Sequence, residues 1–129
     1  AAIYGPGRGI HLAIKTRYFR ILGSGDNFIS RIHVEDLAAL VIAALESDMT
    51  GSYPAADERP CTAREIAYYC ADLLSLPAPR SSKKLPADET RRVDRQVDGR
   101  AICKLLGVKL RYPSYREGIA AIIEKETAK

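Results

Sequence analysis

The stretch from Phe28 to Glu46 reads FISRIHVEDLAALVIAALE and joins two different patterns. Its first part suits a strand over 28–34, in which positions 28, 30, 32 and 34 would point to one side and 29, 31 and 33 to the other. In its second part, residues 37–45 are all Leu, Ala, Val or Ile. A helix that is apolar on every side is normally buried on every side. We therefore expect a core helix here, with the rest of the chain packed against it.

Length and composition describe an ordinary globular chain. The 129 residues suit one domain or a piece of a larger one, and 47% of them are hydrophobic. No segment reads as a signal peptide, and the apolar run is far shorter than the roughly 20 residues that span a bilayer. Cys61, Cys70 and Cys103 are widely spaced and form no CxxC pair. We therefore expect no metal site, no disulfide framework, no membrane contact and a cytoplasmic location.

The net charge of +4 is unevenly distributed. Eleven Lys or Arg and four Asp or Glu lie between residues 80 and 116, a local balance of +7, so the remainder carries −3. A basic segment can bind phosphate groups or nucleic acid. The simpler interpretation is a solvated basic face, and no interleaved aromatic residues favour RNA. We expect no nucleic-acid partner.

The sequence before this stretch predicts two strands and a helix. The apolar run 1–4 suits a strand of a parallel sheet and ends at the breaker cluster Gly5-Pro6-Gly7. One amphipathic helix is expected within 10–19, with Leu12, Ile14 and Phe19 pointing inward. Residues 20–22 read as a short strand, and the turn-rich segment 23–27 would join it to 28–34 as a hairpin.

The sequence after this stretch predicts further strands and helices. We expect a strand over 51–56 and a helix whose capping box is Thr62 and Glu65. The face of that helix would contain Ile66, Tyr69, Cys70 and Leu73. A loop over 77–95 would lead to a helix over 99–106, capped by Asp98 and closed by Gly107. A strand is expected over 108–112 and a helix over 115–125, which completes an α/β pattern. Ser114 and Glu117 would begin this helix, and its buried residues would be Ile119, Ile122 and Ile123.

Candidate functional groups gather near the first strand and the strand 28–34. The Gly5–Gly9 loop has the context of a phosphate loop but not its spacing, so a turn that shapes a pocket is favoured. Arg31 and His33 share one face of their strand and could bind an anion. Alternatively, Arg31 pairs with an acid and His33 is a hydrogen-bonded structural residue. The two acids at 35 and 36 are explained by their place at a helix start.

Nothing in the chain predicts a nucleophilic enzyme. The only histidines are His11 and His33, there is no GxSxG motif, and the cysteines fall on helix faces or at a helix start. We therefore assign no catalytic residue within these 129 residues.

Four motifs together resemble a known family. They are IYGPGRG, SRIHVEDLAALVIAALE, GSYPAADERPCTAREIAYYCADLLSLP and GRAICKLLGVKLRYPSYREGIAAI. Their order and spacing are similar to the carboxy-terminal half of the extended or atypical short-chain dehydrogenases/reductases, the NAD-dependent epimerase/dehydratase-like proteins. Two departures, Ile29 where an Arg is common and Gly99 where an Asn is common, argue against a nucleotide-sugar substrate.

The resemblance implies the carboxy-terminal part of a Rossmann-type parallel sheet plus the small substrate-binding subdomain. The whole chain, 1–129, would be a fragment whose amino-terminal dinucleotide-binding half, with the GxxGxxG loop and the Tyr-xxx-Lys pair, is missing. NAD or NADP would bind the intact protein and not this fragment. Residues 1–4 and 51–56 would be sheet strands, and Gly5, Pro6 and Gly7 would lie near the cofactor.

The resemblance also implies the partners of the chain. Arg31, His33 and Tyr4 would contact a small-molecule substrate, and the loop with Arg91 and Arg92 would act as a lid. The intact protein would be an oxidoreductase or epimerase/dehydratase acting on a hydroxyl or carbonyl carbon, and the fragment alone would be inactive. We expect the fragment to self-associate in place of its missing half. A catalytically dead sensor or scaffold and, last, a basic nucleic-acid module are the alternatives.

Overall fold

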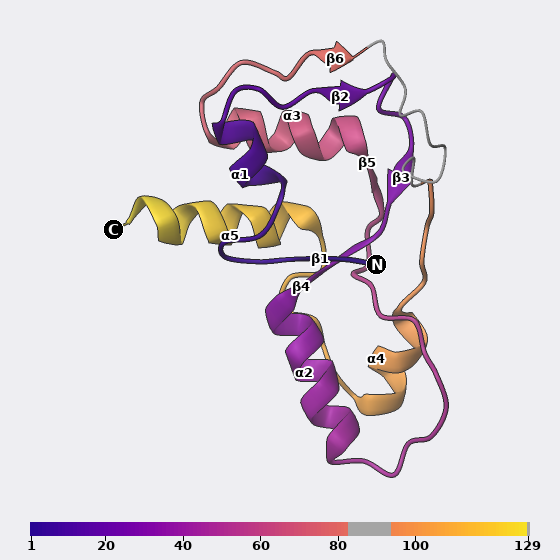
Figure 1. Cartoon of the computed structure of the whole chain (residues 1–129). Coiled ribbons are helices and arrows are strands. Elements are labelled where there is room, and N and C mark those ends of the chain that lie inside the picture. Colours follow the sequence, from indigo (N-terminus) through magenta and orange to yellow (C-terminus); the bar gives the residue numbers. More distant parts are fainter. Residues whose placement is uncertain (83–93, 129) are drawn as a thin grey trace.

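The computed structural model describes residues 1–82 and 94–128 as a mixed α/β structure, which confirms the predicted class. Figure 1 shows α1, α3 and α5 in one part of the molecule, α2 and α4 in the other, and β1 and β4 between them. Along the chain the elements are β1 (Ala2–Tyr4), α1 (Ile10–Lys15), β2 (Ile21–Leu22), β3 (Phe28–Ile29), β4 (Arg31–His33), α2 (Val34–Leu45), β5 (Cys61–Thr62), α3 (Ala63–Leu73), β6 (Ser81–Ser82), α4 (Arg100–Leu106) and α5 (Tyr115–Thr127).

The first strand is parallel, as its sequence predicts. β1 pairs with β4 in the register Ala2 to Arg31, Ile3 to Ile32 and Tyr4 to His33. The strand predicted over 28–34 is confirmed at 28–29 and 31–33. It divides at Ser30 into β3 and β4, which have different partners, and Val34 already belongs to α2. The Ser30 hydroxyl accepts a hydrogen bond from the Val97 amide at 2.6 Å, so it is bonded outside the strand ladder.

The predicted hairpin between 20–22 and 28–34 is wrong. β2 pairs in parallel with β6, and β3 pairs antiparallel with β5. The amides that begin α3 explain the separation, because Ala63 donates to the Asn27 carbonyl and Arg64 to the Gly25 carbonyl, each at 3.0 Å. The segment between β2 and β3 is therefore bonded to a helix start rather than folded into a tight turn.

Two predicted strands are absent from the described residues, those over 51–56 and 108–112. Residues 51–56 have no ladder partner; the amide that reaches β4 is that of Asp57, which donates to the Arg31 carbonyl at 2.7 Å. In 108–112, Leu110 and Tyr112 are buried and their neighbours exposed, as the alternation predicts. The amides of Arg111 and Tyr112, however, donate to a carboxylate instead of a strand.

The helix ends follow local sequence closely. The Thr62 hydroxyl accepts from the Glu65 amide at 3.1 Å, and the Ser114 hydroxyl accepts from the Arg116 amide at 3.2 Å. Gly107 closes α4 in the left-handed conformation, with φ 66°. α1 is shorter than predicted, since the amides of Thr16 and Arg17 turn back to the carbonyls of Ala13 and Ile14 and end the helix.

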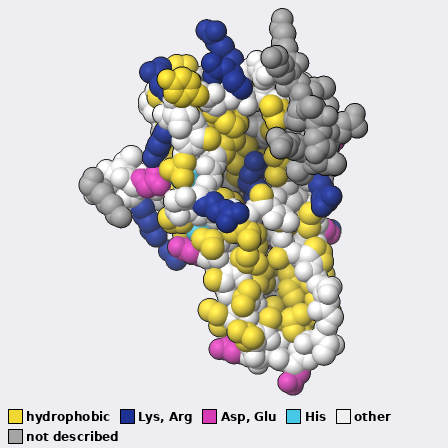
Figure 2. Space-filling view, in the orientation of Figure 1, with side chains coloured by type: hydrophobic (Ala, Val, Ile, Leu, Met, Phe, Trp, Pro, Cys, Tyr) yellow, Lys and Arg dark blue, Asp and Glu magenta, His cyan; other side chains and the backbone are white. Residues whose placement is uncertain are grey.

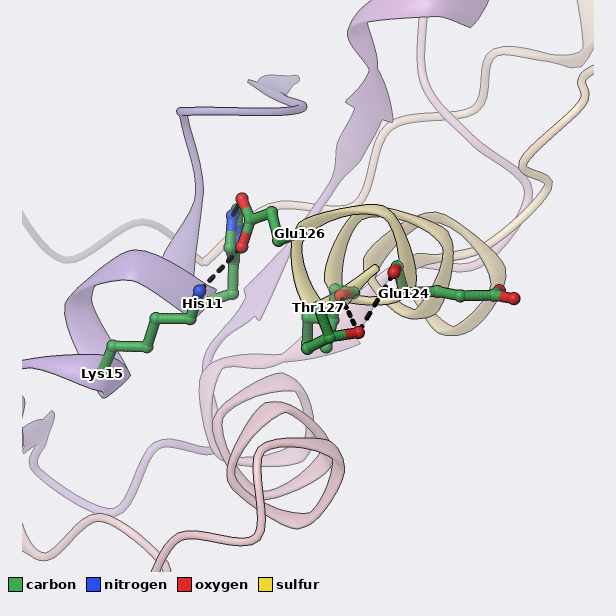
Figure 3. A network of polar contacts seen from close by, with 6 residues as sticks. His11, Lys15, Glu124, Glu126 and Thr127 are labelled. Atoms are coloured by element: carbon green, nitrogen blue, oxygen red, sulfur yellow. Dashed lines mark hydrogen bonds and ion pairs between the residues drawn. The ribbon is translucent and has the colours of Figure 1, made fainter. Parts of the chain in front are cut away.

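The main core lies between α1, α3 and α5. Ile66, Cys70, Ile119, Ile122 and Ile123 are buried there as predicted, with Ile14 from α1. Leu12 and Leu73, predicted to point inward, are each 37% exposed because the buried side of each short helix turns away from them. Figure 3 shows α1 tied to α5 by Lys15 Nζ and Glu126 Oε2, 2.7 Å apart, beside the buried His11.

The apolar helix α2 is not buried all round, so that prediction is wrong. Of its side chains only Asp36 and Leu40 are buried, and Val41, Ile42 and Leu45 are 51%, 57% and 81% exposed. α2 packs on α4 through Leu40 and Ile102, and no described element covers its other side. Figure 2 shows the hydrophobic surface over this part of the molecule. No helix within the described ranges is long and apolar enough to cross a membrane.

Candidate functional site

The candidate site lies where β1 ends beside β4, because ligands of parallel sheets bind at the carboxyl ends of the strands. The Gly5-Pro6-Gly7 turn follows directly. Gly5 and Arg8 exchange two backbone hydrogen bonds of 2.8 and 3.0 Å that close the turn. Gly7 has φ +76°, and no atom lies within 4 Å of the place where its Cβ would be. The tip of the turn is therefore open to the close approach of a ligand.

His33 is a buried, hydrogen-bonded residue in this structure. Its Nδ1 accepts from the Glu35 amide at 3.0 Å and so caps α2. Its ring stacks on Tyr112, with centroids 4.2 Å apart, and meets the edge of Tyr4 at 5.2 Å. Burial lowers the pKa of His33, so the neutral ring that can accept the capping bond is favoured. The structural interpretation of this histidine explains all of these contacts.

Tyr4 is buried beside His33. Its hydroxyl donates a 3.5 Å hydrogen bond to the Ser114 carbonyl, and burial together with the charges of Asp57 and Asp36 raises its pKa. Gly118 on α5 leaves room for the ring, because a Cβ there would collide with the Tyr4 hydroxyl. The packing of β1 against α5 therefore depends on a glycine that the sequence analysis did not single out.

Arg31 lies apart from the aromatic group. It is half-buried, and its Nη1 donates to the Cys61 Sγ at 3.3 Å. Among the described residues no acid forms an ion pair with Arg31, contrary to the structural alternative for this residue. Its one side-chain hydrogen bond within the described residues is thus to a thiol, which keeps Arg31 as the candidate for binding an anionic or polar group.

Asp57 is a functional candidate that the sequence analysis treated as part of a loop. Its carboxyl group is buried, with Oδ1 accepting from the Arg59 amide at 3.2 Å and Oδ2 unpaired in the described structure. Burial raises the pKa of Asp57 to about 7, although the Arg59 amide and the charge of Arg31 oppose the shift. It lines a surface cleft of about 280 Å³ with Glu58 and other residues. A carboxyl group with such a pKa can gain or lose a proton near neutral pH.

Asp36 connects this region to the segment before α5. Its two carboxylate oxygens accept from the amides of Arg111 and Tyr112 at 2.8 and 2.9 Å. The sequence analysis explained Asp36 by its place at a helix start; the structure gives it a longer-range role, fixing Tyr112 against His33.

The other candidates from the sequence are the basic loop, possible metal ligands and the three cysteines. The loop residues Arg91 and Arg92 lie outside the described residues. Within residues 1–82 and 94–128, no three metal-ligating side chains group together. Cys61, Cys70 and Cys103 are free thiols, and burial raises the pKa of Cys61 to about 11 and of Cys70 to about 12. These two thiols are therefore protonated at neutral pH.

Comparison with solved structures gives clear matches over nearly the whole chain. A functionally unknown conserved protein from Silicibacter pomeroyi is 32% identical, with a TM-score of 0.85, and the match covers 97% of this chain and 47% of that one. UDP-glucose 4-epimerase from Thermotoga maritima, solved with UDP-glucose, is 17% identical with a TM-score of 0.79, covering 100% and 45%. The human epimerase family protein SDR39U1, solved with NADPH, is 24% identical with a TM-score of 0.74, covering 95% and 46%.

The chain has the fold of about half of an epimerase/dehydratase chain. Other matches are dTDP-glucose 4,6-dehydratases solved with NAD, so the resemblance in the sequence is confirmed at the level of fold. The chain spans less than half the length of each of these structures. No protein-family model and no curated protein matches the sequence.

Proposed function

We propose that these 129 residues form the substrate-pocket part of a NAD(P)-dependent epimerase/dehydratase or oxidoreductase that acts on a hydroxyl or carbonyl carbon. The main support is the parallel pair β1 and β4, which ends at the open Gly5-Pro6-Gly7 turn inside a fold that matches dinucleotide-bound structures. Because those structures are about twice as long, we propose that the dinucleotide-binding half of the protein lies outside this carboxy-terminal fragment.

The proposed cofactor is NAD or NADP, which supplies the hydride-transfer chemistry when bound. The turn at Gly5, Pro6 and Gly7 suits a place beside it, because Gly7 lets a flat ring approach the backbone without contact with a Cβ. Arg31 would hold an anionic or polar group of the substrate. Tyr4 and His33 would form one wall of the pocket, largely through their backbones, since their side chains are packed against Ser114 and Tyr112.

The predicted compartment is the cytoplasm, because three widely spaced cysteines do not indicate the disulfide framework of a secreted protein. The substrate class within hydroxyl and carbonyl compounds stays open, and Ile29 and Gly99 argue against a nucleotide sugar.

A hydride-transfer assay on the intact protein, followed by NAD(P)H absorbance across hydroxyl and carbonyl compounds, tests the proposal. With an accepted compound, Arg31→Gln should raise KM by about ten- to a hundredfold, the range for hydrogen bonds to a charged group, while kcat changes little. Arg31→Lys should recover part of this loss, and Lys109→Gln on an exposed segment should behave as wild type. Cofactor binding without any turnover would favour a non-catalytic sensor, and an unchanged KM in Arg31→Gln would contradict the role of Arg31.

A further inference from the structure

A second cleft, of about 160 Å³, opens between the segment that joins α1 to β2 and the segment that joins α3 to β6. None of the residues proposed above for substrate or cofactor lines it. Its rim carries three arginines, and its floor is apolar; the residues that matter are Arg17, Arg20, Arg80, Ile14, Phe19 and Leu76. Figure 2 shows Lys and Arg side chains beside hydrophobic ones at this end of the molecule.

Two of these arginines, Arg20 and Arg80, directly precede the two paired strands β2 and β6. β2 and β6 are parallel with Ile21 opposite Ser81, so the residues just before them lie at the same end of the pair. The Ile21 amide donates to the Arg80 carbonyl at 3.0 Å and fixes this register. Two like charges held near each other repel, unless an opposite charge lies between them. Among the described residues no carboxylate forms an ion pair with either guanidinium group.

Arg17 reaches the cleft from an unfavourable backbone conformation. Its φ is +65°, in the left-handed region, at the position just after a helix where glycine is usual. A residue other than glycine is disfavoured in this region, because its Cβ lies too close to the following carbonyl oxygen. Two locally unfavourable features, the gathering of like charges and the left-handed Arg17, thus occur at one cleft, and an anion bound there would offset the charge repulsion.

The cleft is also shaped for more than a bare ion. Ile14 is 3% exposed and belongs to the main core, and Phe19 and Leu76 pack against that core. Pro77 and Pro79 stiffen the opposite wall, because their rings fix φ. The Arg20 guanidinium is held by the Phe19 carbonyl at 3.0 Å. A preorganised apolar floor favours a ligand with a small hydrophobic part next to its charge.

We propose that this cleft binds a compact phosphate monoester, with Arg17, Arg20 and Arg80 around the phosphate and the ester's hydrophobic group on the floor. Guanidinium groups match phosphate oxygens with paired, charge-assisted hydrogen bonds. Three positive charges suit the nearly dianionic phosphate better than a singly charged carboxylate. The site is independent of the proposed oxidoreductase function, because it shares no residue with the pocket around Arg31.

The test is a titration of the purified protein with inorganic phosphate and with phenyl phosphate, followed residue by residue by amide chemical shifts in NMR. Both should saturate a single site at the cleft, and phenyl phosphate should bind about tenfold tighter because the floor buries its ring. The double variant Arg20→Gln, Arg80→Gln should weaken binding by at least about tenfold. It should also unfold at a higher temperature in phosphate-free buffer, which a purely structural role for these arginines would not produce.

Two matched controls separate the site from general charge and backbone effects. Lys109→Gln removes a charge outside the cleft and should bind as wild type. Arg17→Gly should raise the unfolding temperature while weakening phosphate binding. Ser75→Gly relieves the equivalent left-handed position after α3, with φ +56°. It should raise the unfolding temperature and leave phosphate binding unchanged.

Three results would overturn the proposal. The first is a set of chemical-shift changes that spreads over the surface and does not saturate. The second is a loss of phosphate binding in Lys109→Gln as large as in the double arginine variant. The third is a short oligonucleotide that binds far tighter than phenyl phosphate, with a steep salt dependence. The last result would identify a polyanion-binding face instead.

Discussion

At Asp57 a carboxyl group is buried with one oxygen unpaired, and its ionisation should affect stability. Its pKa rises from 3.8 to about 7, so between these values the folded state binds more protons than the unfolded state. By linkage the contribution of Asp57 to stability is present below pH 3.8 and is lost as the pH rises to about 7. Asp57→Asn cannot ionise and should be more stable than wild type at pH 8, by at most about 4 kcal/mol.

The measurement is urea unfolding of wild type and Asp57→Asn from pH 5 to pH 8. The gap between the two proteins should widen as the pH rises and level off above about pH 7. Glu58→Gln, at the exposed neighbouring carboxylate, should follow the wild-type profile. A gap that stays constant over this range would show that Asp57 titrates normally.

At this scale the sequence predicted the residues whose partners are near in the chain. The caps at Thr62 and Ser114 and the left-handed Gly107 depend on three or four neighbouring positions. Asp57, Asp36 and Gly118 were missed or misread, since their environments come from segments that are distant in the sequence. The partial exception is His33, whose structural alternative was stated but whose stacking on Tyr112 needed the tertiary structure.

Among the elements, α2 departs furthest from its prediction, and its two sides should respond differently to truncation. Leu40 is 4% exposed and Leu45 is 81% exposed. Leu40→Ala should destabilise the 129-residue chain by about 2–4 kcal/mol, because it leaves a cavity against α4. Leu45→Ala should change stability by no more than about 0.5 kcal/mol. Thermal or urea unfolding measures both losses. If the two variants lose the same stability, the outer side of α2 is buried in the 129-residue chain, contrary to this account.

The type of an element was predictable where the hydrophobic pattern agreed with the capping or helix-breaking residues at its ends, as in β1, α3, α4 and α5. The pairing of strands was not predictable, because a strand of two or three residues is too short for its side-chain pattern to specify a partner or a register. Residues 108–112 illustrate the limit. Their alternation correctly predicts which side chains are buried, but Asp36 takes the amides that a neighbouring strand would have bonded. Burial pattern and strand pairing are therefore separate predictions.

For the molecule as a whole, the exposed side of α2 predicts self-association of the isolated chain. Val41, Ile42 and Leu45 form a continuous apolar surface on one helix, and such surfaces tend to become covered. Light scattering of the purified chain should give a mass above 14.2 kDa that rises with concentration. Ile42→Lys should shift it toward the monomer, whereas Lys109→Gln should not. A monomer at all concentrations would contradict this prediction.

We propose that these residues are one half of a dinucleotide-binding protein. Calorimetric titration of NAD and NADP, first into the 129-residue chain and then into the intact protein, tests it most directly. We predict micromolar binding of one dinucleotide by the intact protein and no measurable binding by the chain alone. Micromolar binding by the 129 residues alone would contradict the claim.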